Sequence, residues 1–312
     1  MKKILSFLLM LALCPHIAVA APRTLVVMLD APMNPNHAPL IVAQQEGFFK
    51  KEGIDVKFVE PHSPKEAINA TVTQQVDIGI TEQPELLTQV DHHQPIIRIG
   101  TLIDKPLDCL VVLSDSHIDS LADLQNKRIG TLQKNLLDTL MLQSFLTQQG
   151  LKNHVSIVNL HQKLMQALLS HRVDAVSGLK RNVEVPELDA AHHALNVFLP
   201  EEHGIPSYDA LIFITHLNKL HDPRLPRFLA ALEEAVRYLD EHPRQAWEKF
   251  AKTHPNANTP VNRDTWFSTL TYFSENPANF DSAAWENFAA FLKQNNIIRK
   301  VQPVSQYAIT LG

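Results

Sequence analysis

Apolar and polar positions along this chain repeat in an order of short apolar strands and longer amphipathic helices. Leu25–Asp30 is an apolar run that ends on a carboxylate, and the polar loop Asn34–His37 then opens a helix with Pro39 in its first turn. That helix is expected to stop at Gly53, where glycine favours a left-handed cap, and Ile54–Val59 alternates as a strand does. Open α/β sheets hold small ligands in such loops, between the carboxyl end of a strand and the start of a helix.

The same alternation continues to about residue 214, and the pattern is then helical. Strands that alternate with helices indicate a largely parallel sheet. Beyond Pro223, residues Phe228, Leu232 and Leu239 share one helix face. The further strands expected are Val76–Ile80, Ile96–Leu102, Leu110–Leu113, Lys127–Thr131, Val155–Asn159, Val173–Ser177 and Leu211–Ile214.

These elements form two α/β blocks, followed by a helical tail. We expect residues 22–110 together with 212–312 to form one lobe, and residues 111–211 to form the other. The strands near 110–113 and 211–214 would be the crossovers of a two-strand hinge. Two lobes joined in this way can close around a ligand held between them.

The first twenty residues have the pattern of a secretory signal peptide. Two lysines precede the apolar stretch Ile4–Leu13, and Ala18–Ala20 offers a cleavage site of small residues. Lipidation at Cys14 is disfavoured because Leu13 occupies a position that normally needs a small residue. No later segment approaches the roughly 20 apolar residues that span a bilayer. The sequence therefore predicts an exported, periplasmic protein.

Charge and cysteine content narrow the range of partners. The formal charge is −5, and loss of the two signal-peptide lysines would make it −7. An acidic exported protein without a basic cluster is a poor candidate for binding nucleic acid or an anionic membrane. Only Cys109 would remain, inside an apolar run, so we expect a buried thiol and no intramolecular disulfide. Small molecules or other proteins are the expected partners.

Longer motifs give the chain a family resemblance. The segment from Leu29 to Pro61 contains NPNHAPLIVAQQEGFFKKEGIDVKFVEP, and it resembles the solute-binding proteins of the NMT1/THI5-like group. These proteins serve ABC importers of thiamine pyrimidine precursors. Further segments resemble that group's motifs in the same order, over roughly residues 24–250. They are Val76–Ile80, Leu121–Gly130, Arg181–Glu184 and Pro200–Asp209.

The resemblance implies both a fold and a function. The fold would be that of a type II periplasmic binding protein, with two α/β lobes joined by a two-strand hinge. The protein would be a monomeric, non-catalytic component that hands a thiamine pyrimidine precursor to an inner-membrane ABC permease. It implies no cofactor. The pairs His92-His93 and His192-His193 also lack the i, i+4 spacing of a zinc helix, so we expect no metal site.

A pyrimidine precursor is flat and rich in N–H donors and ring-nitrogen acceptors. Its site needs carboxylate or amide oxygens, a donor and an aromatic face. Asp30, Asn34 and His37 follow the first strand and are candidate ligand contacts. For Asn34 the alternative is an Asx turn that caps the helix, for His37 a packing role, and for Asp30 a brace for the loop.

The later motifs supply four more candidates. Glu184 follows a strand and offers the acceptor that an aminopyrimidine needs, and it is the strongest candidate in the chain. Asn182 is a candidate that would contact the ligand or orient Glu184. Gln83 follows the strand Val76–Ile80, and Tyr208 would supply an aromatic face or pack in the hinge.

Two departures from the family pattern leave the identity of the ligand undecided. Ala31 stands where the family usually has tryptophan, and Glu82 stands where relatives tend to have tyrosine. Loss of an indole removes a stacking surface worth on the order of 1 kcal/mol. The alternative is the same fold with another small organic ligand, such as an aliphatic sulfonate, a nitrile-derived compound or a riboflavin-like ring.

An enzyme is the less favoured alternative. The family contains a pyrimidine synthase branch, which carries a lysine and, four residues later, a donor histidine. The matching positions here are Thr81 and Glu85. A Schiff base needs an amine and the donor role needs an imidazole, and neither side chain supplies one.

Overall fold

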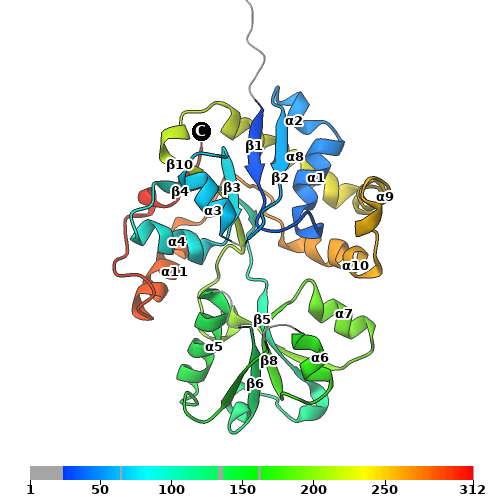
Figure 1. Ribbon diagram of the computed structural model, residues 1–312, viewed down its shortest axis with the longest axis vertical. Coiled ribbons are helices and arrows are strands. Elements are labelled where there is room, and N and C mark those ends of the chain that lie inside the picture. The colour runs from blue at the N-terminus through cyan, green and yellow to red at the C-terminus, as the bar shows by residue number, and fades with distance from the viewer. Residues whose placement is uncertain (1–23, 64, 133–135, 161–162, 312) are drawn as a thin grey trace, which may run out of the picture.

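The structure is a computed structural model that describes residues 24–311, apart from residues 64, 133–135 and 161–162. The expected signal peptide lies outside the described residues. The chain forms two lobes, each built on one five-stranded sheet with helices packed on it (Figure 1). Among the described residues, no helix is long and apolar enough to cross a membrane.

Lobe 1 contains both ends of the described chain. Its sheet has the strand order β2-β1-β3-β10-β4, in which β1 is parallel to β2 and β3, and β10 is antiparallel to β3 and β4. Its strands are β1 (Leu25–Met28), β2 (Val56–Val59), β3 (Ile78–Thr81), β4 (Ile96–Ile103) and β10 (Leu211–His216). Its helices are α1 (Ala38–Gln45), α2 (Phe48–Lys51), α3 (Glu66–Val72), α4 (Gln83–Asp91), α8 (Arg224–Glu241), α9 (Pro243–Thr253), α10 (Pro260–Thr269) and α11 (Ser282–Gln294).

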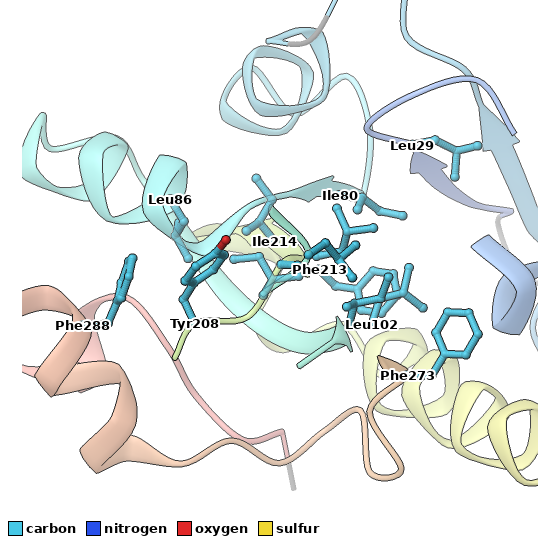
Figure 2. Packing of buried hydrophobic residues seen from close by; sticks show 14 of the residues in the cluster. Leu29, Ile80, Leu86, Leu102, Tyr208, Phe213, Ile214, Phe273 and Phe288 are labelled. Atoms are coloured by element: carbon cyan, nitrogen blue, oxygen red, sulfur yellow. The ribbon is translucent and has the colours of Figure 1, made fainter. Parts of the chain in front are cut away.

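The helical tail completes the core of lobe 1. Phe228 of α8 stacks on Phe49 of α2 at 5.5 Å between ring centroids, and it meets Phe213 of β10 edge-on at 5.2 Å. Phe213 lies among Ile214, Leu102 and other buried side chains of the sheet (Figure 2). The tail therefore packs on the first lobe because its apolar stripe covers a sheet that the first hundred residues leave unfinished.

Lobe 2 has the strand order β7-β6-β8-β5-β9. Strand β6 is parallel to β7 and β8, whereas β5 is antiparallel to β8 and β9. Its strands are β5 (Asp108–Leu113), β6 (Arg128–Thr131), β7 (Ser156–Asn159), β8 (Ala175–Lys180) and β9 (Leu195–Phe198), and its helices are α5 (Leu136–Gln148), α6 (Leu164–Leu169) and α7 (Glu184–Ala190). Cys109 of β5 is fully buried, with its thiol near the Leu179 carbonyl at 3.2 Å.

The expectation of largely parallel sheets needs correction. Strands β5 and β10 each enter a sheet from the other lobe, so they run against their neighbours and make both sheets mixed. Strands β5 and β10, expected to be the crossovers of the hinge, each lie within one sheet instead. The chain crosses between the lobes in the segments 104–107 and 199–210, and we call the second of these the hinge segment.

Three element boundaries also differ from the sequence pattern. The helix expected to run to Gly53 is interrupted at Gly47, whose φ of +81° separates α1 from α2. Strand β9 was not expected, because its alternation is short and mixed. Strand β8 continues beyond Ser177 to Lys180, which brings a lysine to the edge of the sheet that faces lobe 1.

Candidate ligand-binding site

The loop after β1 brings three predicted residues together. Asn34 caps the short helix η1 (Pro35–His37), since its Oδ1 accepts from the Asn36 N–H at 2.9 Å. The His37 ring is fully buried, and its Nδ1 accepts from the Asn34 N–H at 3.2 Å. The ring proton therefore sits on Nε2 and is donated to Asp30 Oδ1 at 2.8 Å.

These contacts support the structural alternatives for the loop, in which Asn34 caps the helix, His37 packs and Asp30 braces the loop. Both nitrogens of His37 are used within the loop, and the Asn34 amide is used by the cap and by the Pro32 carbonyl. Burial alone would raise the pKa of Asp30, but its hydrogen bond with His37, with a contribution from the charge of Lys180, lowers it. Asp30 is thus held as a carboxylate and remains 29% exposed.

Asn182 joins the two lobes. Its side chain is fully buried, and its Nδ2 donates to Asn36 Oδ1 and to Thr269 Oγ1, both at 2.8 Å. Its backbone carbonyl accepts from Ser268 Oγ at 2.6 Å. Asn36 and Thr269 belong to lobe 1, so these contacts hold the start of α7 against η1 and α10.

Glu184 is the first residue of α7 and is half-buried. Its Oε2 accepts from the Lys180 N–H at 2.8 Å, which closes the turn between β8 and α7. Burial raises the pKa of Glu184, although that hydrogen bond and the charge of Lys180 oppose the shift. The turn therefore fixes the carboxyl group beside the lysine.

Gln83 and Tyr208 lie where lobe 1 meets the hinge segment. Gln83 is buried, and its Oε1 accepts from the Asp209 N–H at 2.7 Å. Tyr208 is buried against Phe288, at 5.2 Å between ring centroids (Figure 2). Both residues also line a cavity of about 1140 Å³ in lobe 1, between the hinge segment, α8 and α11. Packing in the hinge is thus the observed role of the Tyr208 ring.

Sequence reasoning missed the ion pair at the centre of the interlobe region. Lys180 at the end of β8 donates to both oxygens of Asp108 at the start of β5, at 2.7 and 2.8 Å. The two strands are antiparallel and the residues are register partners, so the pair follows from strand pairing. Asp108 is 1% exposed, whereas the Lys180 side chain keeps 30% exposure.

Further carboxylates surround this pair. Asp138 is buried in the first turn of α5, and Glu82 is half-buried at the N-cap of α4, the lobe 1 helix that contacts α5. Together with the pair they form a group that we call the interlobe acidic cluster. Among the described residues, its members are Asp30, Glu82, Asp108, Asp138 and Glu184, together with Lys180.

Crowding of carboxylates changes their protonation. Burial, together with the charges of Asp108, Asp138 and Asp30, raises the pKa of Glu82 to about 8 in spite of Lys180. Burial and Asp108 likewise raise the pKa of Asp138 to about 7. Lys180 itself resists deprotonation, because Asp108 and Glu82 raise its pKa against the effect of burial.

The balance of charge indicates what this region can bind. Among the described residues, five carboxyl groups lie around the Lys180 ammonium, so a cation or a donor-rich neutral molecule finds acceptors there, whereas an anion meets the charge of Asp30 and of any other ionised carboxylate. The described residues contain no group of three or more His, Cys, Asp or Glu side chains arranged to hold a metal ion. The chemistry offered is therefore hydrogen bonding and charge complementarity.

Only part of this cluster was visible in the sequence. Lys180 stands at the end of an apolar run, as Asp30 does, and Asp108 stands where another such run begins, so this signal could have found both. Asp138 offered no such signal, because it resembles an ordinary acidic residue in the first turn of a helix. Its place depends on how α5 packs across β8.

The comparisons with known proteins agree with this architecture. A family described as NMT1/THI5 like matches residues 34–246. A Haemophilus influenzae protein whose name assigns it to thiamine biosynthesis is 38% identical over 297 residues, with 93% of each chain covered. The chain belongs to the NMT1/THI5-like family.

Other relatives of this NMT1/THI5-like protein carry two kinds of name. The formylaminopyrimidine-binding protein of Halalkalibacterium halodurans is 26% identical, with 91% of this chain and 88% of the relative covered. A protein of Legionella pneumophila named 4-amino-5-hydroxymethyl-2-methylpyrimidine phosphate synthase is 27% identical, with 90% and 89% covered. The family therefore includes proteins named for binding and proteins named for synthesis.

Solved structures show the fold of this NMT1/THI5-like protein. The periplasmic aliphatic sulphonate binding protein SsuA from Escherichia coli superposes with a TM-score of 0.74 at 15% identity, and 93% of each chain is covered. The alkanesulfonate-binding protein SsuA from Xanthomonas axonopodis gives a TM-score of 0.68 at 16% identity, with 93% of this chain and 99% of that one covered. The fold is that of the periplasmic binding proteins, and at this identity the likeness says nothing about the ligand.

Proposed function

We propose that this protein is the periplasmic solute-binding component of an ABC importer and that it binds a thiamine pyrimidine precursor between its lobes. The observation that carries the proposal is the interlobe acidic cluster. An aminopyrimidine presents an exocyclic amine that donates hydrogen bonds, and we assign the acceptor to Glu184, whose carboxylate is held by the turn between β8 and α7. The names of the Haemophilus and Halalkalibacterium relatives support the same ligand class.

The negative charge of the acidic cluster argues against a sulfonate as the ligand, although the two solved structures above are named for sulfonate binding. A sulfonate would place a permanent negative charge beside carboxylates such as Asp30, and the Lys180 ammonium is already held by both oxygens of Asp108. A neutral or cationic heterocycle meets no such penalty.

A binding role is also favoured over catalysis. A synthase that forms a Schiff base needs a lysine that can lose its proton, and the carboxylates around Lys180 raise its pKa instead. The same carboxylates would repel the phosphate of pyridoxal phosphate. The end of β3 carries Thr81, which is buried and offers no amine.

Export and transfer to a permease belong to the proposal as well. The sequence begins with a signal-peptide pattern, and two lobes joined by two short crossings suit closure around a solute. Lobe closure would present a ligand-dependent surface to a membrane partner.

Thermal unfolding with a panel of ligands tests the proposal. The panel contains 4-amino-5-hydroxymethyl-2-methylpyrimidine and its formylaminomethyl counterpart, an alkanesulfonate, a nitrile and riboflavin. A ligand at 100 times its dissociation constant stabilises by about 2.7 kcal/mol, which raises Tm by about 4 °C in a chain of this size. We expect this rise with the pyrimidines. A rise with another class and none with any pyrimidine would reject the proposed ligand.

A matched pair of variants locates the site. Glu184→Gln keeps the size and the turn but removes the charge, so pyrimidine affinity should fall about tenfold to a hundredfold with folding intact. Asp189→Asn removes an exposed carboxylate from the same helix and should leave affinity unchanged. Equal affinities for Glu184→Gln and the parent protein would exclude Glu184 from the site.

A further inference from the structure

The cavity of about 1140 Å³ in lobe 1, called here the lobe 1 cavity, is separate from the interlobe acidic cluster, since no member of the cluster lines it. Sites that hold small organic ligands occupy roughly 300–1,000 Å³, so this cavity is large enough for one. Both crossings between the lobes reach it, Asp104 and Lys105 from the first and residues 207–209 from the hinge segment.

Aromatic and apolar side chains make up much of the lining. Val236 and Leu239 come from α8, Trp285 comes from α11, and Phe273 precedes that helix. Figure 2 shows two of the lining rings, Phe273 and Tyr208. Trp285 and Phe273 are 2% and 4% exposed, so packing holds them in place. Such a lining suits the apolar body of an organic molecule.

Asp209 adds a carboxylate whose orientation is fixed. Its Oδ2 accepts from Thr101 Oγ1 at 2.7 Å and from Trp285 Nε1 at 3.1 Å. Its backbone N–H donates to Gln83 Oε1 at 2.7 Å. No donor among the described residues bonds to Oδ1, and that oxygen is accessible rather than enclosed by protein. The carboxylate is therefore oriented in advance, with one oxygen left for a ligand.

Asp209 is largely ionised at neutral pH. Burial raises its pKa to about 6, although the hydrogen bond from Thr101 and the charge of Arg98 oppose the shift. Arg98 donates to Thr101 Oγ1 and to backbone carbonyls, and it makes no direct hydrogen bond to Asp209. The free oxygen of Asp209 therefore keeps its negative charge for a ligand.

The remaining charged residues of the lining are mostly acidic. The two cations, Lys105 and Arg237, already have acceptors, because Lys105 Nζ donates to the Thr271 carbonyl at 2.6 Å and Arg237 lies 3.3 Å from Glu233 Oε1. Among the described residues, the carboxylates that line the cavity are Asp104, Asp209, Asp240, Glu275 and Asp281. This balance favours a cation and disfavours an anion.

We propose that the lobe 1 cavity is a second ligand site, which takes a small organic cation with an aromatic body and binds its ammonium group through Asp209 Oδ1. The aromatic body packs against the lining rings, and the ammonium donates to the oxygen that Thr101 and Trp285 leave free. A hydrogen bond between two charged groups is roughly twice as strong as one between neutral groups. This inference does not depend on the pyrimidine proposed for the interlobe site.

Isothermal titration at pH 7 with three indoles of similar shape tests the preference for charge. Tryptamine is a cation, tryptophol carries a hydroxyl in place of the amine, and indoleacetate is an anion. We expect tryptamine to bind at least about tenfold more tightly than tryptophol, and indoleacetate to bind more weakly than both. Tryptophol binding as tightly as tryptamine, or no binding of tryptamine, would overturn the inference.

Variants locate the cation in the cavity. Asp209→Asn keeps an acceptor for Thr101 and Trp285 but removes the charge, so tryptamine affinity should fall at least about tenfold and tryptophol affinity less than about threefold. Ala284→Phe fills part of the cavity from α11 and should weaken tryptamine at least about tenfold even if Asp209→Asn does not fold. Glu248→Gln, exposed on α9, should change neither affinity.

Glu184→Gln separates this inference from the proposed function. It should leave tryptamine affinity unchanged, because Glu184 does not line the lobe 1 cavity. If Glu184→Gln weakens tryptamine and Asp209→Asn and Ala284→Phe do not, the cation binds between the lobes and the second site is refuted. Failure of every pyrimidine to bind would reject the proposed function and leave the tryptamine result unaffected.

Discussion

The carboxylates between the lobes differ in protonation because their partners differ. Asp30 receives a hydrogen bond from a buried imidazole, and its pKa is lowered despite burial. Burial together with the charges of neighbouring carboxylates raises the pKa of Glu82 to about 8 and that of Asp138 to about 7. Charge in this region therefore depends on pH within the physiological range.

The stability of the ligand-free protein should fall as pH rises from 5 to 8. The folded-state pKa of Glu82 is raised to about 8, so between about pH 4.5 and pH 8 the folded protein binds more protons than the unfolded chain. Glu82→Gln removes this contribution and should be more stable than the parent at pH 8, by about 1–2 kcal/mol, with a smaller difference at pH 5. Urea unfolding of both proteins at the two pH values measures this. An identical difference at pH 5 and pH 8 would be inconsistent with a raised pKa.

Among elements, the short helix η1 shows how local chemistry positions the loop. Asn34 caps it, and His37 completes a capping box by accepting from the Asn34 N–H. The same histidine then reaches back to Asp30 at the end of the strand, so three side chains stiffen the loop from within.

Replacement of Asn34 distinguishes capping from ligand contact. Asn34→Ala should lower the free energy of unfolding by about 1 kcal/mol, because it removes the cap, and should change pyrimidine affinity by less than about threefold. Asn34→Asp keeps an acceptor and should lose less stability. The measurements are urea unfolding and calorimetric titration. A loss of affinity of more than about tenfold with unchanged stability would instead make Asn34 a ligand contact.

The sequence predicted most elements but not how they meet. Alternation identified β1, β3, β4, β6 and β10, because each is an apolar run bounded by polar residues. It stopped β8 at Ser177, since Gly178 interrupts the run, and so Lys180 was missed. Antiparallel pairing of β5 with β8 is set by the return of the chain between lobes, which local patterns do not encode.

The sequence predicted those candidate site residues that belong to a family motif. Asp30 and His37 lie in the long first family segment, whereas Asn182 and Glu184 lie in the short motif Arg181–Glu184. The contact between Asn182 and Asn36 shows that the two segments stand on facing lobes. Asp108 and Asp138 come together only through packing of β5 and α5 around β8. Their proximity is a property of the tertiary structure, and Asp138 stands in no distinctive local pattern.

For the whole molecule, the contact of Asn182 with Asn36 and Thr269 stabilises the arrangement in which the lobes meet. Each of these hydrogen bonds joins Asn182 to a residue of lobe 1, so it forms only when the two lobes are in contact. We infer that closure around a ligand uses the same bonds.

Loss of this contact should favour open forms. Asn182→Ala should leave each lobe folded, enlarge the radius of gyration of the ligand-free protein, and weaken pyrimidine binding about tenfold, because closure then recovers fewer bonds. Small-angle X-ray scattering and calorimetric titration check this, with Asn153→Ala on the exposed surface of lobe 2 as the control. Weaker binding with unchanged dimensions would favour direct ligand contact by Asn182.

A crystal structure of the protein with a bound pyrimidine precursor tests the central claim most directly. The account predicts the ring between the lobes, with an amine nitrogen within hydrogen-bond distance of Glu184 and the acidic cluster around it. A ligand seated in the lobe 1 cavity against Asp209 and Trp285, out of contact with Glu184, would contradict it.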